Sequence, residues 1–348
     1  MVDIEVDPRD HDRVFALINS GGLRRSTDGG QTWTMHNLGP DYEAWGYKAA
    51  CGWFIGLHPG NPDVIWAGSA SGGLWKTTTG GVGADAWDRI DTGHPVLAVS
   101  AIAVTPTNPD VMYIGTGEVY RYQGSTGGDV DRTTRGSYGI GILKSTDGGA
   151  SWSLCLDWTL AQTRGIWSLR LAPHDPDLVY AGTTEGVYRS TDAGTTWVRV
   201  LDALMATDVR IHPTSPDTLL AACGNFFSAG YGIYRSSDGG DNWAKVTAGL
   251  PLSWSGKSQL DIAPSAPNVA YASIAQNSIG FGLYRSTDTG LTWSWVNDSN
   301  YASYQGWYSH YVAVSPFDED FLYCGGIEIW RSTNGGPTLT RRSEWTQI

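Results

Sequence analysis

Two short motifs alternate along the whole chain, and their spacing restricts the fold more than any other feature. The first reads RSTDAGTTW at 189–197, with close copies at 25–33, 144–152, 235–243 and 285–293 and degenerate ones at 76–87 and 331–345. The second is a Pro-x-x-Pro-Asp turn between apolar segments, with first prolines at residues 59, 106, 173 and 213 and degenerate copies at 8, 264 and 316. These prolines recur at a mean step of roughly 51 residues, which indicates a repeat architecture.

Each repeat reads as four short strands. In the fourth repeat these are WSLRLAP, LVYAGT, GVYRST and TWVRVL, which are rich in aromatic and β-branched residues and bounded by turn residues. No segment shows a sustained helical period with caps. We therefore predict an all-β fold: one seven-bladed β-propeller of four-stranded antiparallel blades, in preference to a linear β-solenoid, whose repeat is usually shorter. The predicted domain spans 1–348, with blades at approximately 1–40, 41–92, 93–158, 159–203, 204–250, 251–299 and 300–348.

The nonapeptide falls in the hairpin between the third and fourth strands of each repeat, and we predict that its role is structural. Asp192 can accept hydrogen bonds from backbone N–H groups of the turn, and Gly194 can adopt a conformation that other residues resist. Trp197 is expected to fold back as an apolar plug between blades. The corresponding predicted structural residues are Asp28, Asp147, Asp192, Asp238, Asp288, Trp33, Trp152, Trp197, Trp243 and Trp293.

The pattern Ser-x-Asp-x-Gly-x-Thr-Trp resembles the Asp-box, or bacterial neuraminidase (BNR) repeat, over the whole chain. The strings GSASGGLWKTTTGG, YIGTGEVY, GILKSTDGG and IEIWRSTNGG look most like secreted bacterial propellers labelled glycosyl hydrolase-like or sortilin-like. The resemblance implies the Asp-box propeller fold. It does not imply one activity, because sialidases, xyloglucanase-type hydrolases, sortilin-type receptors and a photosystem II assembly factor resemble this pattern too.

Composition excludes several classes of partner. The formal charge of −12 disfavours nucleic acid, and no apolar run is long enough to predict membrane insertion. The four cysteines form no CxxC pair, so we expect neither a metal site nor a disulfide framework, and no cofactor. The opening MVDIEVDP is no signal peptide, although we expect the chain to be part of a longer secreted protein, extracellular or periplasmic.

Candidate binding residues gather in the loops that should lie opposite the nonapeptides. These loops are 37–53, 117–139, 157–167, 224–232, 250–258 and 298–311, and long loops on a rigid scaffold are where binding usually occurs. They combine aromatic rings, which can stack on sugars, with hydrogen-bonding acids. The predicted ligand-binding residues are Trp45, Trp53, Tyr120, Tyr122, Trp158, Trp167, Phe226, Tyr231, Trp254, Trp307 and Tyr308.

Glycoside hydrolysis would require two carboxyl groups beside one bond, about 5–9.5 Å apart depending on the stereochemical outcome. The best pair in the sequence is Glu118, after the second strand of blade three, and Asp208, at the start of the inner strand of blade five. A sialidase is disfavoured, because the nearest string to its Arg-Ile-Pro motif is Arg210-Ile211-His212. Arg170 and Arg210 occupy the inner-strand position that is acidic in other repeats (Glu5, Asp261), which favours a charge-neutralising ring around the channel.

Two functions remain open on this sequence. The first is an extracytoplasmic glycan-directed protein that works from the aromatic loop face, with polysaccharide hydrolysis as its candidate reaction. The alternative is a scaffold without catalysis, resembling the sortilin-type or assembly-factor propellers, in which the same loops bind a peptide or protein.

Overall fold

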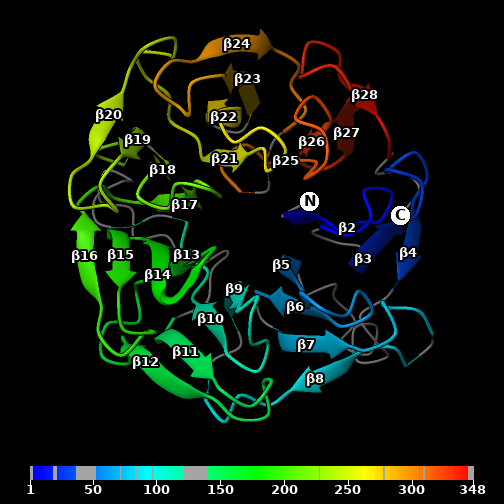
Figure 1. Ribbon diagram of the computed structural model, residues 1–348, viewed down its shortest axis with the longest axis vertical. Coiled ribbons are helices and arrows are strands. Elements are labelled where there is room, and N and C mark those ends of the chain that lie inside the picture. The colour runs from blue at the N-terminus through cyan, green and yellow to red at the C-terminus, as the bar shows by residue number, and fades with distance from the viewer. Residues whose placement is uncertain are drawn as a thin grey trace.

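Seven four-stranded antiparallel sheets surround a central channel (Figure 1). The structure, a computed structural model, describes residues 3–18, 22–36, 52–70, 72–83, 85–95, 98–120, 122, 139–226, 228–276, 279–303, 305–308 and 310–343. All regular elements in these ranges are strands. The predicted all-β, seven-bladed propeller is therefore confirmed.

Each sheet consists of four strands that are consecutive in the chain, and the first strand of each lies at the channel. Blade 1 contains β1 (Asp3–Val6), β2 (Val14–Ile18), β3 (Gly22–Ser26) and β4 (Thr34–His36). Blade 2 contains β5 (Gly52–Leu57), β6 (Ile65–Ser69), β7 (Gly73–Thr77) and β8 (Asp88–Ile90). Blade 3 contains β9 (Val99–Val104), β10 (Met112–Thr116), β11 (Gly141–Ser145) and β12 (Ser153–Asp157).

The remaining blades follow the same order. Blade 4 contains β13 (Ile166–Ala172), β14 (Asp175–Thr183), β15 (Gly186–Ser190) and β16 (Val198–Leu201). Blade 5 contains β17 (Ala206–Ile211), β18 (Leu219–Cys223), β19 (Gly232–Ser236) and β20 (Ala244–Val246). Blade 6 contains β21 (Ser258–Ile262), β22 (Ala270–Gln276), β23 (Ile279–Ser286) and β24 (Ser294–Asn297). Blade 7 contains β25 (Tyr311–Val314), β26 (Leu322–Gly325), β27 (Ile329–Ser332) and β28 (Thr340–Arg341).

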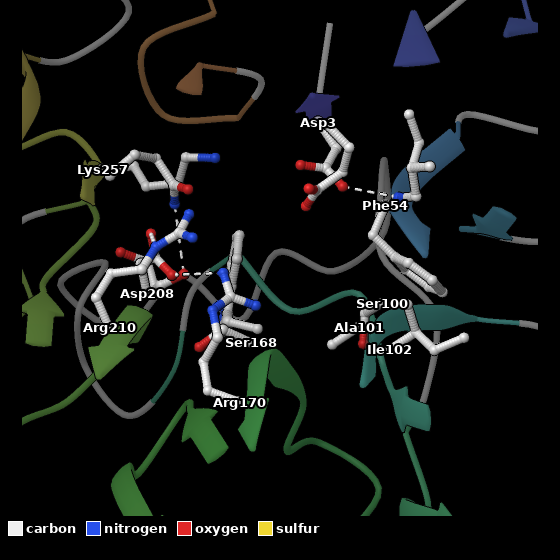
Figure 2. A pocket seen from close by; sticks show the side chains of 15 residues that line it. Asp3, Phe54, Ser100, Ala101, Ile102, Ser168, Arg170, Asp208, Arg210 and Lys257 are labelled. Atoms are coloured by element: carbon white, nitrogen blue, oxygen red, sulfur yellow. Dashed lines mark hydrogen bonds and ion pairs between the residues drawn. The ribbon is translucent and has the colours of Figure 1, made fainter. Parts of the chain in front are cut away.

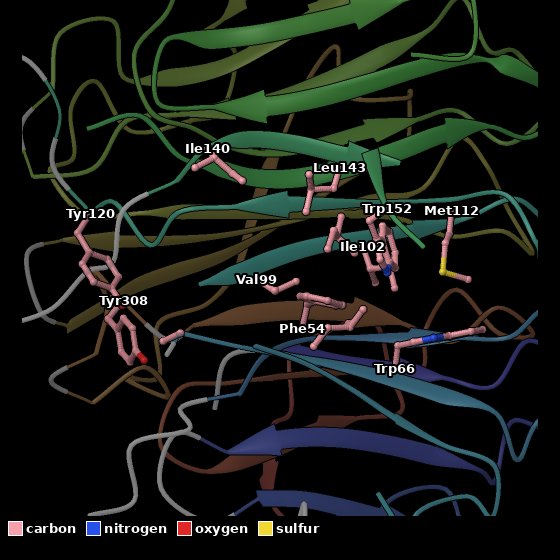
Figure 3. Packing of buried hydrophobic residues seen from close by; sticks show 13 residues of the cluster. Phe54, Trp66, Val99, Ile102, Met112, Tyr120, Ile140, Leu143, Trp152 and Tyr308 are labelled. Atoms are coloured by element: carbon pink, nitrogen blue, oxygen red, sulfur yellow. The ribbon is translucent and has the colours of Figure 1, made fainter. Parts of the chain in front are cut away.

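The hydrophobic core lies between neighbouring blades. One cluster packs Phe54 and Trp66 of blade 2 against Ile102 and Leu143 of blade 3 (Figure 3). Another closes the ring, because Ile4, Val6, Val14 and Ala16 of blade 1 pack against Tyr311, Ala313, Tyr323 and Ile329 of blade 7. Since every blade is built from its own residues, this apolar packing takes the place of a shared sheet at the junction of blades 1 and 7.

The nonapeptide folds as a compact hairpin around its aspartate, as expected. In blade 4 the buried Ser190 Oγ donates to Asp192 Oδ1 (2.8 Å) and accepts from the N–H of Gly194 (2.8 Å). Thr196 donates through both its backbone N–H and its hydroxyl to the Asp192 carboxylate, at 2.8 and 2.7 Å. Gly194 adopts a φ of 83°, a region that favours glycine. The Trp197 indole donates to the carbonyl of Gly194, so the Trp closes its own hairpin.

The equivalent aspartates are held in the same way. Hydrogen bonds from Ser151 and Ser145 hold the pKa of Asp147 at about 2, and similar bonds lower the pKa of Asp192. Matching donors reach Asp28 from Thr32, Asp238 from Asn242 and Asp288 from Thr292. Trp152, Trp243 and Trp293 donate to their own hairpin glycines, and Trp33 packs at the junction of blades 7 and 1.

Two kinds of contact fix the hairpins to their surroundings. A backbone N–H of each hairpin donates to a carbonyl at or beside the turn between the first two strands of the same blade, as Gly239 does to Asp217 (2.9 Å). In blades 3 to 7 a basic residue just before the hairpin serine also reaches the next blade, and in blade 4 Arg189 Nη1 donates to the carbonyl of Gly239 (2.7 Å). Hairpins and Pro-Asp turns therefore share one face, the box face, and the inter-blade loops lie on the opposite face, the loop face.

Replacement of Ser190 by Ala is expected to lower the free energy of unfolding by about 1–3 kcal/mol, because the buried N–H of Gly194 loses its acceptor. Urea unfolding would measure the change. Ser294→Ala, at an exposed position of the outer strand β24, is the matched control and should change little. Equal effects of the two substitutions would contradict a structural role for the hairpin serine.

Candidate functional site

The central channel contains two cavities that meet at Glu5 and Arg210. The inner cavity, about 80 Å³, is lined by Asp3, Glu5, Phe54, Ile55, Ser100, Ala101, Ile102, Trp167, Ser168, Arg170, Thr207, Asp208, Arg210, Lys257 and Gln259 (Figure 2). The second, about 220 Å³, lies at the box face and is lined by Ile4, Glu5, Val6, Pro8, Arg210, Asp261, Ile262, Pro264, Ala313, Val314 and Pro316. Because the turn prolines line the second cavity, Glu5 and Arg210 separate the inner cavity from the box-face mouth.

A network of ion pairs occupies one side of the channel, from blades 4 to 6. Asp208 accepts from Arg170 Nη2 (3.1 Å) and Arg210 Nε (3.2 Å), and Arg210 also pairs with Asp261 (3.2 Å). Figure 2 shows Arg170, Arg210, Asp208 and Lys257 together on this side, across from Phe54, Ser100 and Ile102. Charge neutralisation is thus found for Arg170, Arg210 and Asp261, on one side of the channel and not as the predicted ring around it.

Inner-strand carboxylates also connect neighbouring blades. Asp3 accepts the N–H of Ile55 in blade 2 (2.7 Å), Asp208 that of Leu260 in blade 6 (3.1 Å), and Asp261 that of Val314 in blade 7 (2.7 Å). These hydrogen bonds fix the positions of the carboxylates and replace part of the hydration that the carboxylates lose on burial.

Asp3 and Glu5 place two carboxyl groups side by side on β1. They are two residues apart in one strand and therefore point to the same side. Burial raises the pKa of Glu5 from 4.5 to about 8, with the Asp3 charge adding to the rise, and burial raises the pKa of Asp3 to about 6. The sequence analysis predicted that Glu5 faces the channel but did not identify Asp3 as a channel residue. The signal was available, because Asp3 precedes its turn proline by five residues, as Asp208 does.

Lys257 is a second residue that the sequence did not single out. It comes one position before β21, is 3% exposed, and donates from Nζ to the carbonyl of Tyr308 (2.8 Å). Its ammonium lies 5.7 Å from the centre of the Trp167 ring. Burial lowers the pKa of Lys257 to about 7, so this amine loses its charge near neutral pH.

Five predicted aromatic residues meet over the channel, in a group that we call the aromatic platform: Tyr120, Trp167, Phe226, Trp307 and Tyr308. The Tyr120 ring centre lies 5.1 Å from those of Trp307 and Tyr308 and 6.0 Å from that of Trp167, and Phe226 lies 5.2 Å from Trp307. Figure 3 shows Tyr120 beside Tyr308. Residues from blades 3, 4, 5 and 7 can only meet near the axis, so the platform covers the loop-face end of the channel.

Hydrogen bonds from Asn225 connect the loops of the platform, and three of its five rings are partly exposed to solvent. Asn225 Nδ2 donates to the carbonyls of Trp307 (2.8 Å) and Tyr120 (3.3 Å), which ties three loops together. Tyr120 and Tyr308 are buried, whereas Trp167, Phe226 and Trp307 are half-buried.

The other predicted binding aromatics lie apart from the platform. Trp158 is 5% exposed and packs edge-on to Tyr188, and Trp254 is 4% exposed and packs edge-on to Tyr231. The Tyr122 hydroxyl donates to Glu185 (2.9 Å), which also pairs with Arg164 (3.0 Å). Ligand contact at the buried Trp158 and Trp254 would require their loops to open. Trp45 and the side chain of Trp53 lie outside the described residues.

The predicted catalytic pair is divided between two environments. Asp208 is 1% exposed, lines the inner cavity, and its carboxylate is bound by Arg170, Arg210 and the N–H of Leu260. Glu118 is 5% exposed, accepts a hydrogen bond from the Tyr120 hydroxyl, and is not among the residues lining that cavity. A catalytic role for this pair stays a prediction.

Within the described ranges, one group of side chains has metal-ligand spacing: Asp10, His11 and Asp12, all exposed at a box-face turn. Cys155, Cys223 and Cys324 are free thiols, and Cys51 lies outside the described residues. No helix in the described part of the chain is long and apolar enough to cross a membrane.

Comparison with known families agrees with this architecture. A model of the BNR/Asp-box repeat matches residues 24–35, and one described as Sortilin, neurotensin receptor 3 (Sortilin-Vps10) matches residues 185–315. The chain is an Asp-box β-propeller.

Solved structures resemble this propeller over nearly its full length. A GH74 xyloglucanase from Xanthomonas campestris superposes with a TM-score of 0.73 at 18% identity, over 99% of this chain and 54% of that one. YCF48 from Cyanidioschyzon merolae superposes with a TM-score of 0.63 at 15% identity, over 95% of this chain and 94% of that one. At these identities the likeness establishes the fold alone.

One relative is detected by sequence. A xyloglucanase from Hypocrea jecorina is 33% identical over 91 residues, which are 23% of this propeller and 11% of that enzyme. The propeller thus spans about half of the Xanthomonas enzyme and matches about a tenth of the Hypocrea enzyme.

The acidic pair predicts a pH dependence of stability. Because the pKa of Glu5 rises from 4.5 to about 8 on folding, the folded state binds more protons than the unfolded state between these pH values. The contribution of Glu5 to the free energy of unfolding should therefore fall as pH rises through this window, and Glu5→Gln, which cannot ionise, should remove that contribution. Urea unfolding at pH 6 and pH 8 would test this, with Glu319→Gln, outside the channel, as control. A Glu5→Gln profile equal to wild type would contradict it.

Proposed function

We propose that this propeller is an extracytoplasmic glycan-directed protein that binds sugar rings on the aromatic platform. The observation that carries the proposal is the meeting of Trp167, Phe226 and Trp307, three half-buried rings from three blades, around buried Tyr120 and Tyr308. Rings held this way present flat apolar faces at little cost in conformational entropy on binding. Sugar rings have C–H faces that complement such surfaces.

The comparisons support a glycan ligand. The one relative detected by sequence and the first solved structures that match are named xyloglucanases or GH74 enzymes. The platform also lies on the loop face, where binding residues on rigid scaffolds usually occur.

A second function, binding of a peptide or protein, is favoured by the likeness to YCF48. That protein is matched over nearly its whole length, and one solved structure is YCF48 bound to D1 peptide. Under this alternative the same aromatic residues would anchor a partner, and segment 117–139 would serve as a docking arm.

Phe226→Ala should weaken binding of xyloglucan oligosaccharides at least about tenfold, or 1.4 kcal/mol, because it removes one face of the platform. Calorimetry against a panel of plant and bacterial polysaccharides would measure this. Trp295→Ala is the matched control, because Trp295 is 55% exposed on the outer strand of blade 6 and should not contribute. Absence of binding across the panel would overturn the glycan proposal, and capture of a peptide that is lost on deletion of 122–136 would favour the alternative.

Catalysis is tested separately. If Glu118 and Asp208 form a hydrolytic pair, Glu118→Gln and Asp208→Asn should each lower the release of reducing ends by orders of magnitude while sugar binding is retained. Circular dichroism would check that both variants keep the fold. Turnover that survives both substitutions would exclude this pair, and no turnover by the wild type on any polysaccharide would leave a glycan-binding protein without catalysis.

A further inference from the structure

The inner cavity has an acidic wall and a basic wall, and we propose that it binds a small zwitterion, an α-amino acid of about the size of glycine or alanine. Its ammonium group would face Asp3 and Glu5, and its carboxylate would face Lys257 and Arg170. This site adjoins the aromatic platform, with which it shares Trp167, and the proposal does not depend on glycan binding.

The acidic wall comes from blade 1 alone. Asp3 and Glu5 are neighbours on one side of β1, and Asp3 accepts N–H groups from Ile55 and Ile4. Among the described residues, neither carboxyl group is in an ion pair with a lysine or arginine. Two adjacent carboxyl groups in a buried channel cannot both ionise readily, so one of them keeps its proton unless a cation is placed between them.

The basic wall comes from blades 4 to 6. Asp208 lies between Arg170 and Arg210, and within the described ranges the hydrogen-bond acceptor of Lys257 is the neutral carbonyl of Tyr308 alone. An ammonium group has three donors, so Lys257 can bind an incoming carboxylate without losing this bond.

Each wall lacks a counter-charge in direct contact: Arg210 and Arg170 act on Glu5, and Asp208 and Asp3 act on Lys257, without forming an ion pair with it in the described residues. The pKa of Glu5 is raised to about 8 and that of Lys257 is lowered to about 7, because burial disfavours both charged forms. A ligand with one charge of each sign would supply the missing partner to both walls. A simple anion or cation would satisfy one wall and leave the other unchanged.

Further polar atoms of the lining lack partners. Ser100 Oγ, Ser168 Oγ and Arg170 Nε are buried without a hydrogen bond, and all three residues line the inner cavity. Buried polar groups are normally satisfied, so these atoms indicate space for a hydrogen-bonding guest.

Size and access fit a small guest. A volume of about 80 Å³ corresponds to about six water-sized groups at 10–15 Å³ each, close to the five non-hydrogen atoms of glycine. The platform covers the loop-face end, whereas the box-face cavity of about 220 Å³ leads to the inner one past Glu5 and Arg210. The guest would therefore enter from the face opposite the platform.

Titration calorimetry of the intact protein with glycine and alanine would test the proposal, with acetate and methylammonium as single-charge probes. We expect one site per chain for glycine or alanine, and binding at least tenfold weaker for acetate and methylammonium. Glu5→Gln should weaken glycine binding at least tenfold and leave acetate binding unchanged. Lys257→Met should weaken both.

The controls separate recognition from damage to the fold. Glu5→Gln replaces a group that is mostly protonated at neutral pH, so it should fold normally, and urea unfolding would verify this. Glu319→Gln, outside the channel, should bind glycine as wild type does. The proposal is overturned if glycine and alanine give no heat, if acetate binds as tightly as glycine, or if Glu5→Gln binds glycine normally. In the last two cases the cavity would bind anions or water instead.

Discussion

A basic side chain at the start of the Asp-box joins one blade to the next at five of the seven junctions in the described part of the chain. Lys144, Arg189, Arg235 and Arg331 each donate to a backbone carbonyl in the hairpin of the following blade, at 2.6–3.0 Å. In blade 6 the equivalent Arg285 pairs instead with Asp320 of blade 7 (2.7 Å). The acceptors exist because the hairpin turns back on its aspartate and leaves these carbonyls facing the neighbour. The Asp-box thus stabilises its own hairpin and also contributes contacts between neighbouring blades.

The sequence was sufficient for the fold because each signal was repeated. The Ser190–Asp192–Gly194 cluster could be predicted from turn chemistry alone, since all its bonds lie within a few residues. The basic residue before each box could not be assigned a role in this way, because its acceptor lies about one repeat further along the chain. The sequence did not specify the partner of the Thr196 hydroxyl, which donates to Asp192, because that choice depends on the exact path of the turn.

The site was harder to predict because it depends on residues that meet across the axis. Tyr120 and Trp307 are nearly two hundred positions apart, and no local pattern indicates that their rings touch. The aromatic loop residues were recognised as a set, but only Trp167, Phe226 and Trp307 of the platform combine contact with partial exposure. Trp158 and Trp254 have the same residue type and loop context, yet their rings fill gaps beside blades 4 and 5. The pKa values of Asp3 and Lys257 are shifted mainly because burial in the channel removes water from these groups, which a sequence pattern does not reveal.

The junction between blades 7 and 1 has a mechanical consequence. Arg331 reaches the carbonyl of Gly29 there, as Arg189 reaches Gly239 between blades 4 and 5, and apolar side chains fill the space between. This junction therefore holds without a covalent connection, by the same kind of contact that joins blades 3 and 4, 4 and 5, and 5 and 6. The peptide connection between two blades is therefore not what holds them together. Cleavage of one inter-blade loop by a protease would leave the ring closed, because side-chain contacts would still join the two blades.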